Sequence, residues 1–234
     1  MKISENFSNQ FNSLPKPLNA RTALGQIPIV KSPRLLGDFV VWLEQRPNEG
    51  GRTTLLIRPW FASECIPQEL TFPPMNLRSR IHDYGGGELA TQIKGDVIIL
   101  VWIDDHKGCL FQQSFQLLKK DQFNLKHSKY CQAIQSPIPL CRIDDFKLAD
   151  GLIDLSRRKW IGVMEKNNTD YLVSFSLDKQ DQIPEILHTS LGFLGYATLS
   201  FDFQQIAWVE WSEKVMPWEE SQLWKGYLDA SGNT

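Results

Sequence analysis

Short apolar runs separated by polar turns recur along the chain from residue 27 onward. In each of four copies, an apolar run ends in an acidic residue, a polar turn follows, and a second run alternates apolar with polar positions. The paired runs are 39–44 with 53–58, 97–104 with 109–112, 159–165 with 171–175, and 205–210 with 222–228. Runs of this length with period-two alternation are typical of β-strands joined as hairpins.

The four copies predict a repeated unit. The acids that end the first runs are Glu44, Asp104, Glu165 and Glu210, spaced by 60, 61 and 45 residues. Further strand candidates lie upstream at 34–36, 151–154 and 196–200. A repeat of this size, built from three or four antiparallel strands, is typical of a β-propeller blade.

The sequence therefore predicts an all-β fold, a partial β-propeller of about four blades. Its blades are expected at roughly 27–75, 76–145, 146–190 and 191–232, after an irregular lead-in at residues 1–26. No segment of ten or more residues keeps a helical period, and residues 115–126 are interpreted as strand plus connection rather than a short helix. A β-sandwich is the alternative, because it also uses short strands with frequent turns.

Composition narrows the classes of function. The 234 residues are 42% hydrophobic and 22% charged, which is ordinary for a globular protein. A net charge of −2 lacks the basic footprint of nucleic-acid binders, so no nucleic-acid partner is expected. No apolar run reaches 18 residues and the N-terminus lacks a signal-peptide core, so we expect no membrane span and a cytoplasmic location.

Cysteine and histidine spacing gives no sign of a metal or cofactor site. The four cysteines form no C-x-x-C pair and the four histidines are scattered, so buried reduced thiols are expected. A disulfide between Cys131 and Cys141 is the alternative, and the sequence does not decide between them. The Gly85–Gly87 run lacks the Lys and Ser/Thr of a phosphate loop and predicts a tight turn or a close approach between blades.

Four local sequences carry a more specific signal: residues 43–52 (LEQRPNEGGR), 76–87 (NLRSRIHDYGGG), 149–154 (ADGLID), and 208–224, with WVEW, MPW and LW. In this order they resemble the N-terminal β-propeller of prolyl-oligopeptidase-family serine peptidases, closest to the dipeptidyl aminopeptidase/acylaminoacyl-peptidase branch. The resemblance covers about residues 27–232. Asp83 stands where Glu is usual and Glu219 where Asp is usual, and both keep the charge.

The resemblance implies a function for the whole protein that this sequence does not contain. Family members have a propeller of usually seven blades followed by an α/β-hydrolase domain with a Ser, Asp and His triad. The nucleophile lies in a G-x-S-x-G turn, and this sequence has none. We therefore expect no catalytic residue here and a non-catalytic, substrate-gating propeller portion, truncated before the hydrolase domain and inactive alone.

The expected partners are short peptides and the α/β-hydrolase catalytic domain, which is either missing or carried by a separate chain. The alternative is a stand-alone small propeller that acts as a protein- or peptide-interaction module. Closure of four blades would require the first and last blades to meet.

The candidate substrate- or domain-facing residues are Arg78, Arg80, His82, Asp83, Tyr84, Glu210 and Trp211. Alternation along an extended strand places Arg78, Arg80 and His82 on one side and Ser79, Ile81 and Asp83 on the other.

Two interpretations of these residues stay open. The arginines could bind peptide carboxylates or carbonyls or face the hydrolase domain, or they could pair with Asp83, Asp104 or Glu44 and hold neighbouring blades together. The strand-ending acids could line a channel rim or pair with a nearby Arg. Trp211 and Trp218 could stack on a peptide, although packing between blades is the commoner use of such aromatics.

Overall fold

The computed structural model describes residues 27–62, 64–106, 108–119, 123, 129–141 and 145–232. The lead-in expected at residues 1–26 lies outside these residues. Within them the chain is all-β, with two short 3₁₀ helices, η2 (Pro47–Glu49) and η3 (Ile81–Asp83).

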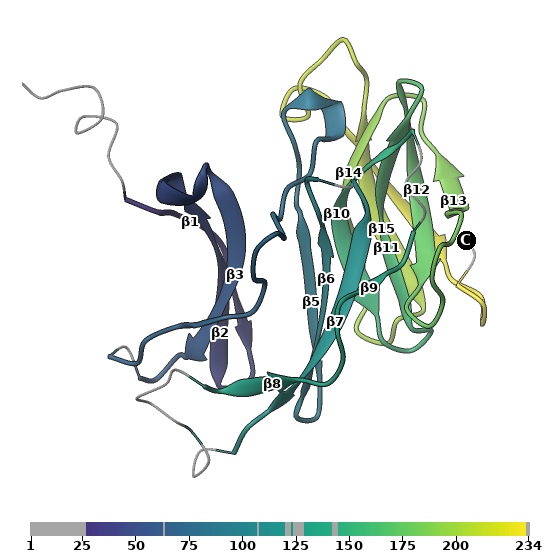
Figure 1. The fold of residues 1–234 in the computed structure, drawn as a ribbon. Helices are drawn as coiled ribbons and strands as arrows, with labels where there is room; N and C mark the ends of the chain where they lie inside the picture. The colour runs from purple at the N-terminus through teal and green to yellow at the C-terminus, as the bar shows by residue number, and fades with distance from the viewer. Residues whose placement is uncertain are drawn as a thin grey trace, which may run out of the picture.

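The strands form four antiparallel sheets that follow one another along the chain (Figure 1). The first sheet contains β1 (Ile29–Leu36), β2 (Phe39–Arg46), β3 (Arg52–Pro59) and β4 (Gln68–Glu69). The second contains β5 (Leu89–Lys94), β6 (Val97–Ile103), β7 (Leu110–Leu117), β8 (Cys131–Ala133) and β9 (Ile138–Pro139), where β8 and β9 both pair with β7.

The third sheet contains β10 (Lys147–Asp154), β11 (Lys159–Lys166), β12 (Thr169–Ser176) and β13 (Glu185–Thr189). The fourth contains β14 (Phe193–Leu199), β15 (Gln205–Trp211) and β16 (Gln222–Tyr227). The sheets are meanders, because strands adjacent in sequence are paired, except that β9 pairs with β7 and not with β8. Four small sheets in series confirm the propeller arrangement and exclude the two-sheet sandwich.

The sequence predicts strand plus connection for the segment 115–126. Residues 115–117 end β7, so the strand part of the interpretation is confirmed. Residues 120–122 and 124–126 lie outside the described residues.

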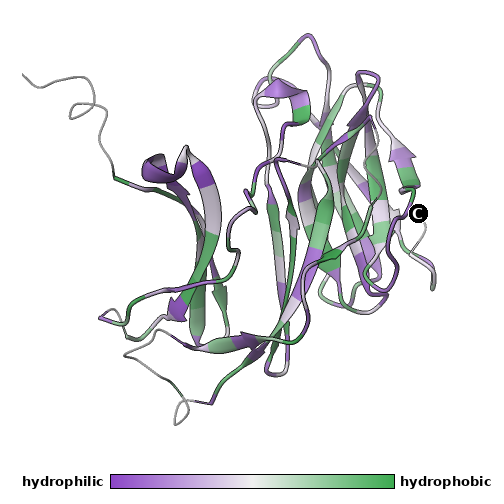
Figure 2. Cartoon of the chain, viewed as in Figure 1, coloured by the Kyte–Doolittle hydropathy of each residue, from purple (hydrophilic) through white to green (hydrophobic). Residues whose placement is uncertain are grey.

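The first strands of the second, third and fourth sheets lie side by side. β10 contacts both β5 and β14, so these strands form the inner side of the arrangement, as in a propeller. One cluster of buried apolar side chains joins the first three sheets, and a second cluster joins the third and fourth sheets with Ile81. Figure 2 shows apolar residues concentrated in the strands and polar residues in many of the connecting turns.

The four sheets form an open arc. In the part of the chain that the structure describes, no hydrogen bond or ion pair links β1–β4 with β14–β16, and the two sheets share no buried cluster. Figure 1 shows β1–β3 on one side and the third and fourth sheets, which overlap in this view, on the other. The contact between first and last blades that a closed four-bladed ring requires is therefore not seen among these residues.

Three of the four inner strands share one irregularity. The pairing register shifts between Lys31 and Arg34 in β1, between Ala149 and Leu152 in β10, and between Gly195 and Thr198 in β14. At each shift one residue adopts a left-handed backbone: Ser32 (φ 52°), Asp150 (φ 53°) and Tyr196 (φ 58°). Each is a β-bulge, in which one extra residue bends the strand and redirects its side chains.

The bulge in β1 changes which residues share a face. Lys31 pairs with Leu43 and Arg34 with Val41, two residues whose side chains point to the same side of β2. Lys31 and Arg34 therefore lie on one face of β1, although three positions apart in a regular strand would place them on opposite faces.

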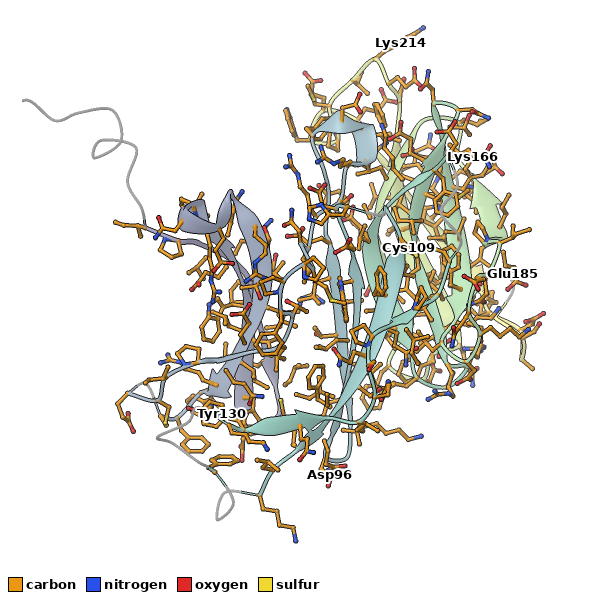
Figure 3. The ribbon with its side chains drawn as sticks, in the orientation of Figure 1. Asp96, Cys109, Tyr130, Lys166, Glu185 and Lys214 are labelled. Atoms are coloured by element: carbon orange, nitrogen blue, oxygen red, sulfur yellow. The ribbon has the colours of Figure 1, made fainter. Side chains whose placement is uncertain are left out.

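The four cysteines are buried and free, as expected for reduced thiols. Figure 3 shows Cys109 among the densely packed side chains of the second and third sheets. Its sulfur lies 3.2 Å from that of Cys141, so the close pair is Cys109 with Cys141 and not Cys131 with Cys141. Burial raises the pKa of Cys131 to about 12, which keeps it protonated at neutral pH.

Candidate functional site

The connection from the first sheet to the second, residues 76–88, carries most of the candidate residues. It starts as extended backbone: Leu77 forms a bridge with Asp104, and the Arg78 amide donates to the Ile103 carbonyl at 3.0 Å. Arg78 and Arg80 are exposed, whereas Ser79 and Ile81 are buried. This is the alternation that the sequence predicts.

The extended backbone ends at Arg80 (φ −119°, ψ 19°), and the prediction for His82 and Asp83 was wrong. Residues 81–83 form η3, with His82 (φ 49°) and Asp83 (φ 66°) in left-handed conformations. Two consecutive left-handed residues reverse the chain, so strand alternation no longer decides where their side chains point. His82 is thereby turned away from Arg78 and Arg80 toward the third sheet.

Hydrogen bonds link His82 to the third sheet and, through Asp170, to the fourth sheet. Its backbone amide donates to Oε2 of Glu165 at 2.6 Å, and its Nε2 lies 2.9 Å from Oδ1 of the buried Asp170. The other Asp170 oxygen accepts the amide of Leu194, the second residue of β14, at 3.0 Å. The hydrogen bond to Asp170 raises the pKa of His82, against the opposing effect of burial.

Charged residues around η3 complete this junction. Lys147 Nζ lies 2.8 Å from Oδ1 of Asp83 and 3.5 Å from Oε1 of Glu165. The ammonium group lowers the pKa of Asp83, whose carboxylate is almost fully exposed. Asp83 and His82 therefore belong to the structural contact between the second and third blades, and neither points into a cavity.

The three glycines that follow allow the second and third blades to approach closely. A Cβ on Gly86 would lie 2.8 Å from the Cβ of Ala149, and one on Gly87 would lie 2.7 Å from Oδ1 of Asp150. Asp150 accepts the Gly87 amide at 2.7 Å, and its own amide donates back to the Gly87 carbonyl at 2.8 Å. The close approach expected from the glycine run is confirmed.

Arg80 has a structural partner that the sequence did not indicate. Its guanidinium contacts both carboxylate oxygens of Asp105, at 2.5 and 3.0 Å. Asp104, one of the expected partners, instead accepts the backbone amides of Asn76 and His106 at 3.0 and 3.2 Å. The arginine is therefore paired within its own blade.

Arg78 has a different environment. No ion pair or side-chain hydrogen bond of Arg78 occurs among the described residues, and its side chain lines a cavity of about 470 Å³ between the first and second blades. Tyr84, Lys31 and Glu88 line the same cavity, and Lys31 Nζ contacts Glu88 Oε1 at 2.5 Å. The cavity thus holds one paired cation and one unpaired cation.

A second cavity of about 500 Å³ lies on the inner side of the arc. It is lined by residues of β1, β5, β10 and β14, and Arg34 is the charged residue among them. Leu152 and Thr198, which stand at the corresponding bulge positions of β10 and β14, line it as well. Burial lowers the pKa of Arg34, and the charge of Glu88 raises it.

Glu210 and Trp211 lie at the end of β15, on a third cavity of about 320 Å³. Glu210 is buried and accepts hydrogen bonds from Trp208 Nε1 at 2.8 Å and Ser190 Oγ at 3.0 Å, while His188 Nε2 lies 2.6 Å away. These contacts make Glu210 a structural residue. Trp211 forms part of the cavity wall, and Trp218 is exposed.

Aromatic contacts connect the two groups of candidate residues. The ring of Phe193 lies 4.9 Å from that of His82 and 5.9 Å from that of Trp211, between ring centroids. The structure therefore brings His82 and Trp211 to the same region, whereas Arg78 and Tyr84 line the separate cavity toward the first blade. Sequence reasoning missed Lys31, Arg34 and Glu88, because none of them lies within the motifs that carry the resemblance.

The strand-ending acids differ in their use. Glu44 accepts from Arg46 at 2.7 Å, as the alternative of a paired acid expects. The other three cap backbone amides or buried side chains, as described above for Asp104, Glu165 and Glu210. None of the four lines the inner cavity.

No group of three or more His, Cys, Asp or Glu side chains is arranged to hold a metal ion within the described ranges. None of the helices in that part of the chain has the length and apolarity needed to cross a membrane.

No protein-family model matches the chain. No curated protein matches it either. Solved structures do match. A puromycin-hydrolyzing peptidase from Mycobacterium tuberculosis has a TM-score of 0.73 at 21% sequence identity, and the match covers 94% of this chain and 33% of that one. The chain has the fold of about a third of that peptidase.

A puromycin hydrolase matches similarly, with TM-scores of 0.69 in one crystal structure and 0.70 in a second, of its S511A mutant. In both cases identity is 22% and the match covers 87% of this chain and 31% of the hydrolase. The fold implied by the sequence resemblance to peptidase propellers is thereby confirmed. The chain spans about a third of the length of the structures it matches.

Proposed function

We propose that this chain is the non-catalytic, substrate-gating propeller portion of a cytoplasmic serine peptidase that acts on short peptides. The observation that carries the proposal is the match of nearly the whole chain to about a third of puromycin-hydrolysing peptidases. The sequence has no G-x-S-x-G turn, which supports a catalytic domain separate from this propeller portion. In this proposal, an α/β-hydrolase domain outside this sequence supplies the nucleophile, base and acid.

The geometry supports gating in a specific way. The cavities of about 470 and 500 Å³ each have the size of a small-ligand site and accept a few peptide residues but not a folded domain. The cavity of about 500 Å³ lies on the inner side of the arc, where a peptide passing through a propeller would travel, and the cavity of about 470 Å³ lies at the junction of the first two blades. Arg78 and Tyr84 are the proposed substrate-facing residues of the original candidate set.

The remaining candidate residues have a supporting role in this proposal. His82, Asp83 and Arg80 fix the connection that carries Arg78, and Glu210 fixes the end of β15 beside Trp211. Dipeptidyl or acylaminoacyl specificity is the finer form of the proposal, and it rests on the sequence motifs alone. The buried, free cysteines fit the reducing conditions of the cytoplasm.

The test has two parts. The purified chain is incubated with a fluorophosphonate probe, which labels activated serines, and with aminoacyl and acyl-peptide chromogenic substrates; a known serine hydrolase is the positive control. We expect no labelling and no turnover. Stoichiometric labelling of one serine with turnover would overturn the assignment of catalysis to another domain.

The second part reads the gene beyond the codon for Thr234. We expect further blade-like repeats followed by a G-x-S-x-G segment, in the same frame or in an adjacent reading frame. Unrelated sequence at that place would instead support a stand-alone interaction module.

A further inference from the structure

We propose that two cavities of this arc, one on its inner side and one between the first and second blades, bind peptides through a carboxylate, with Arg34 and Arg78 as the recognising groups. The inference rests on the proposed function in taking a peptide as the ligand, and it adds the chemical class of that peptide.

The charges of the cavities are opposite in sign to that of the whole molecule. The two cavities are lined by three cations, Lys31, Arg34 and Arg78, and by one carboxylate, Glu88. The complete chain has a net charge of −2. A concave surface with a local excess of cations attracts anionic ligands, because its low-dielectric walls concentrate the field.

The pairing within this set leaves two guanidinium groups available. The Glu88 carboxylate forms an ion pair with Lys31 Nζ at 2.5 Å. Neither Arg34 nor Arg78 has an ion pair or a side-chain hydrogen bond among the described residues, whereas Arg46, Arg52, Arg80, Arg157 and Arg158 all contact carboxylates there. Two unpaired arginines in cavities therefore stand apart from an otherwise well-paired set.

The position of Arg34 indicates a built site rather than a chance surface charge. It occupies the bulge position whose counterparts in the other blades are Leu152 and Thr198, and all three converge on one cavity. A half-buried guanidinium without a partner has lost part of its hydration, so a ligand carboxylate gains more there than at the open surface. The planar guanidinium can hold both carboxylate oxygens at once.

The surroundings of Arg34 add shape to this charge. Gly151 lacks a side chain, while Ile153 and Leu199 are apolar and also line the cavity. An extended peptide with small or apolar side chains and one carboxylate fits this combination. Two sources share this chemistry, an acidic side chain within a peptide and the free C-terminus of a short peptide.

Calorimetric titration of the whole chain with four peptides separates these sources. They are N-acetyl-tetraalanine amide, the same peptide with a free C-terminal carboxylate, the amide with one alanine replaced by glutamate, and the amide with one alanine replaced by lysine. At low ionic strength we expect at least one carboxylate peptide to bind roughly tenfold or more tightly than the neutral amide, and the lysine peptide to bind no better. Added salt should reduce the preference.

Variants assign the effect to the two arginines. Arg34→Gln and Arg78→Gln should each reduce the preference for carboxylate, the double variant should abolish it, and Arg34→Lys should restore part of it. Arg158→Gln is the matched control, because it removes the same charge from an exposed pair with Asp178. Thermal unfolding followed by circular dichroism verifies that each variant is folded.

Three outcomes would overturn the inference: equal affinity for the neutral and carboxylate peptides, a preference that survives in the double variant, or a folded wild-type chain that binds neither carboxylate peptide at millimolar concentration. These outcomes are separate from the failure of the proposed function. A chain with arginine-dependent binding but no hydrolase sequence downstream would keep the inference and lose the gating role. A downstream hydrolase without carboxylate preference would do the reverse.

Discussion

The connection at residues 76–88 has two sides that differ in how completely their polar groups are satisfied. Toward the third sheet, Ser79 Oγ donates to the Leu148 carbonyl at 2.6 Å, and His82 and Gly87 contact carboxylates. Toward the first sheet, a cavity of about 470 Å³ opens and Arg78 is left without a described partner.

The difference separates residues that hold the blades from residues available to a ligand. A buried polar group without a partner costs free energy, so a filled hydrogen-bond network is what a purely structural junction requires. An unpaired guanidinium in a cavity contributes nothing to such a junction. The second side is therefore where substitution should change binding and leave stability intact.

Asp170→Ala should have the largest effect on stability. Asp170 is 3% exposed and holds both His82 and the amide of Leu194, so its removal leaves two groups of different blades without their acceptor. We expect a loss of about 3 kcal/mol in the free energy of unfolding, measured by urea denaturation. Asp178→Ala, at an exposed ion pair, should cost less than about 1 kcal/mol; equal losses would refute the distinction.

Gly86→Ala should have the next largest effect. The new Cβ would meet the Cβ of Ala149 at 2.8 Å, and this atom cannot rotate away, so the two backbones must separate. Overpacking of this kind costs about 1–3 kcal/mol. The control is Gly195→Ala, where the nearest atom lies at 3.4 Å. If both variants unfold at the same urea concentration, the second and third blades are not in tight contact at Gly86.

Rising pH should weaken the same junction. Asp170 raises the pKa of His82, so the protonated imidazole stabilises the fold. This contribution is fully present below the unfolded-state pKa of about 6.5 and is lost as pH rises through the higher pKa of the folded state. His82→Gln should remove this dependence above about pH 6.5, whereas His106→Gln, an exposed histidine, should keep it. An unchanged slope in His82→Gln would contradict the assignment.

Arg34→Gln and Arg78→Gln should have the smallest effect on stability. Neither variant removes an ion pair among the described residues, so the free energy of unfolding should change by no more than about 0.5 kcal/mol. The same urea titrations check this. A loss as large as that of Asp170→Ala would show that these arginines hold the blades together after all.

Period-two patterns predicted the regular part of the fold. The runs at 39–44, 97–104 and 159–165 lie in β2, β6 and β11, except that Asp104 follows the end of β6. These runs were predicted correctly because long apolar runs bounded by turns leave little choice of pairing register. Exposure along residues 77–81 followed alternation for the same reason. Alternation failed at His82 because two left-handed residues follow one another there, and neither is a glycine that would have indicated it.

The candidate site was predicted less completely than the fold. Arg78 and Tyr84 were found because they lie within a recognisable motif. Arg34 was missed because a bulge adds one residue to a strand without a distinctive composition: Ser32 precedes a proline, Asp150 a glycine and Tyr196 an alanine. The convergence of Arg34, Leu152 and Thr198 depends on contacts between blades, and no local pattern contains that information.

The repeated bulge has a consequence for how such an arc can diversify. It creates three equivalent positions, residues 34, 152 and 198, each directly after a bulge. Residues at these positions line one cavity, while the neighbouring residues of each strand pair with the adjacent strand and stabilise the sheet. In this chain they carry a cation, an aliphatic group and a hydroxyl. Because each position lies in a strand whose pairing is already fixed, its residue can be exchanged without redesigning the core. Single substitutions at these three positions can therefore change the ligand preference of the cavity, one position at a time, while the strand pairing stays the same.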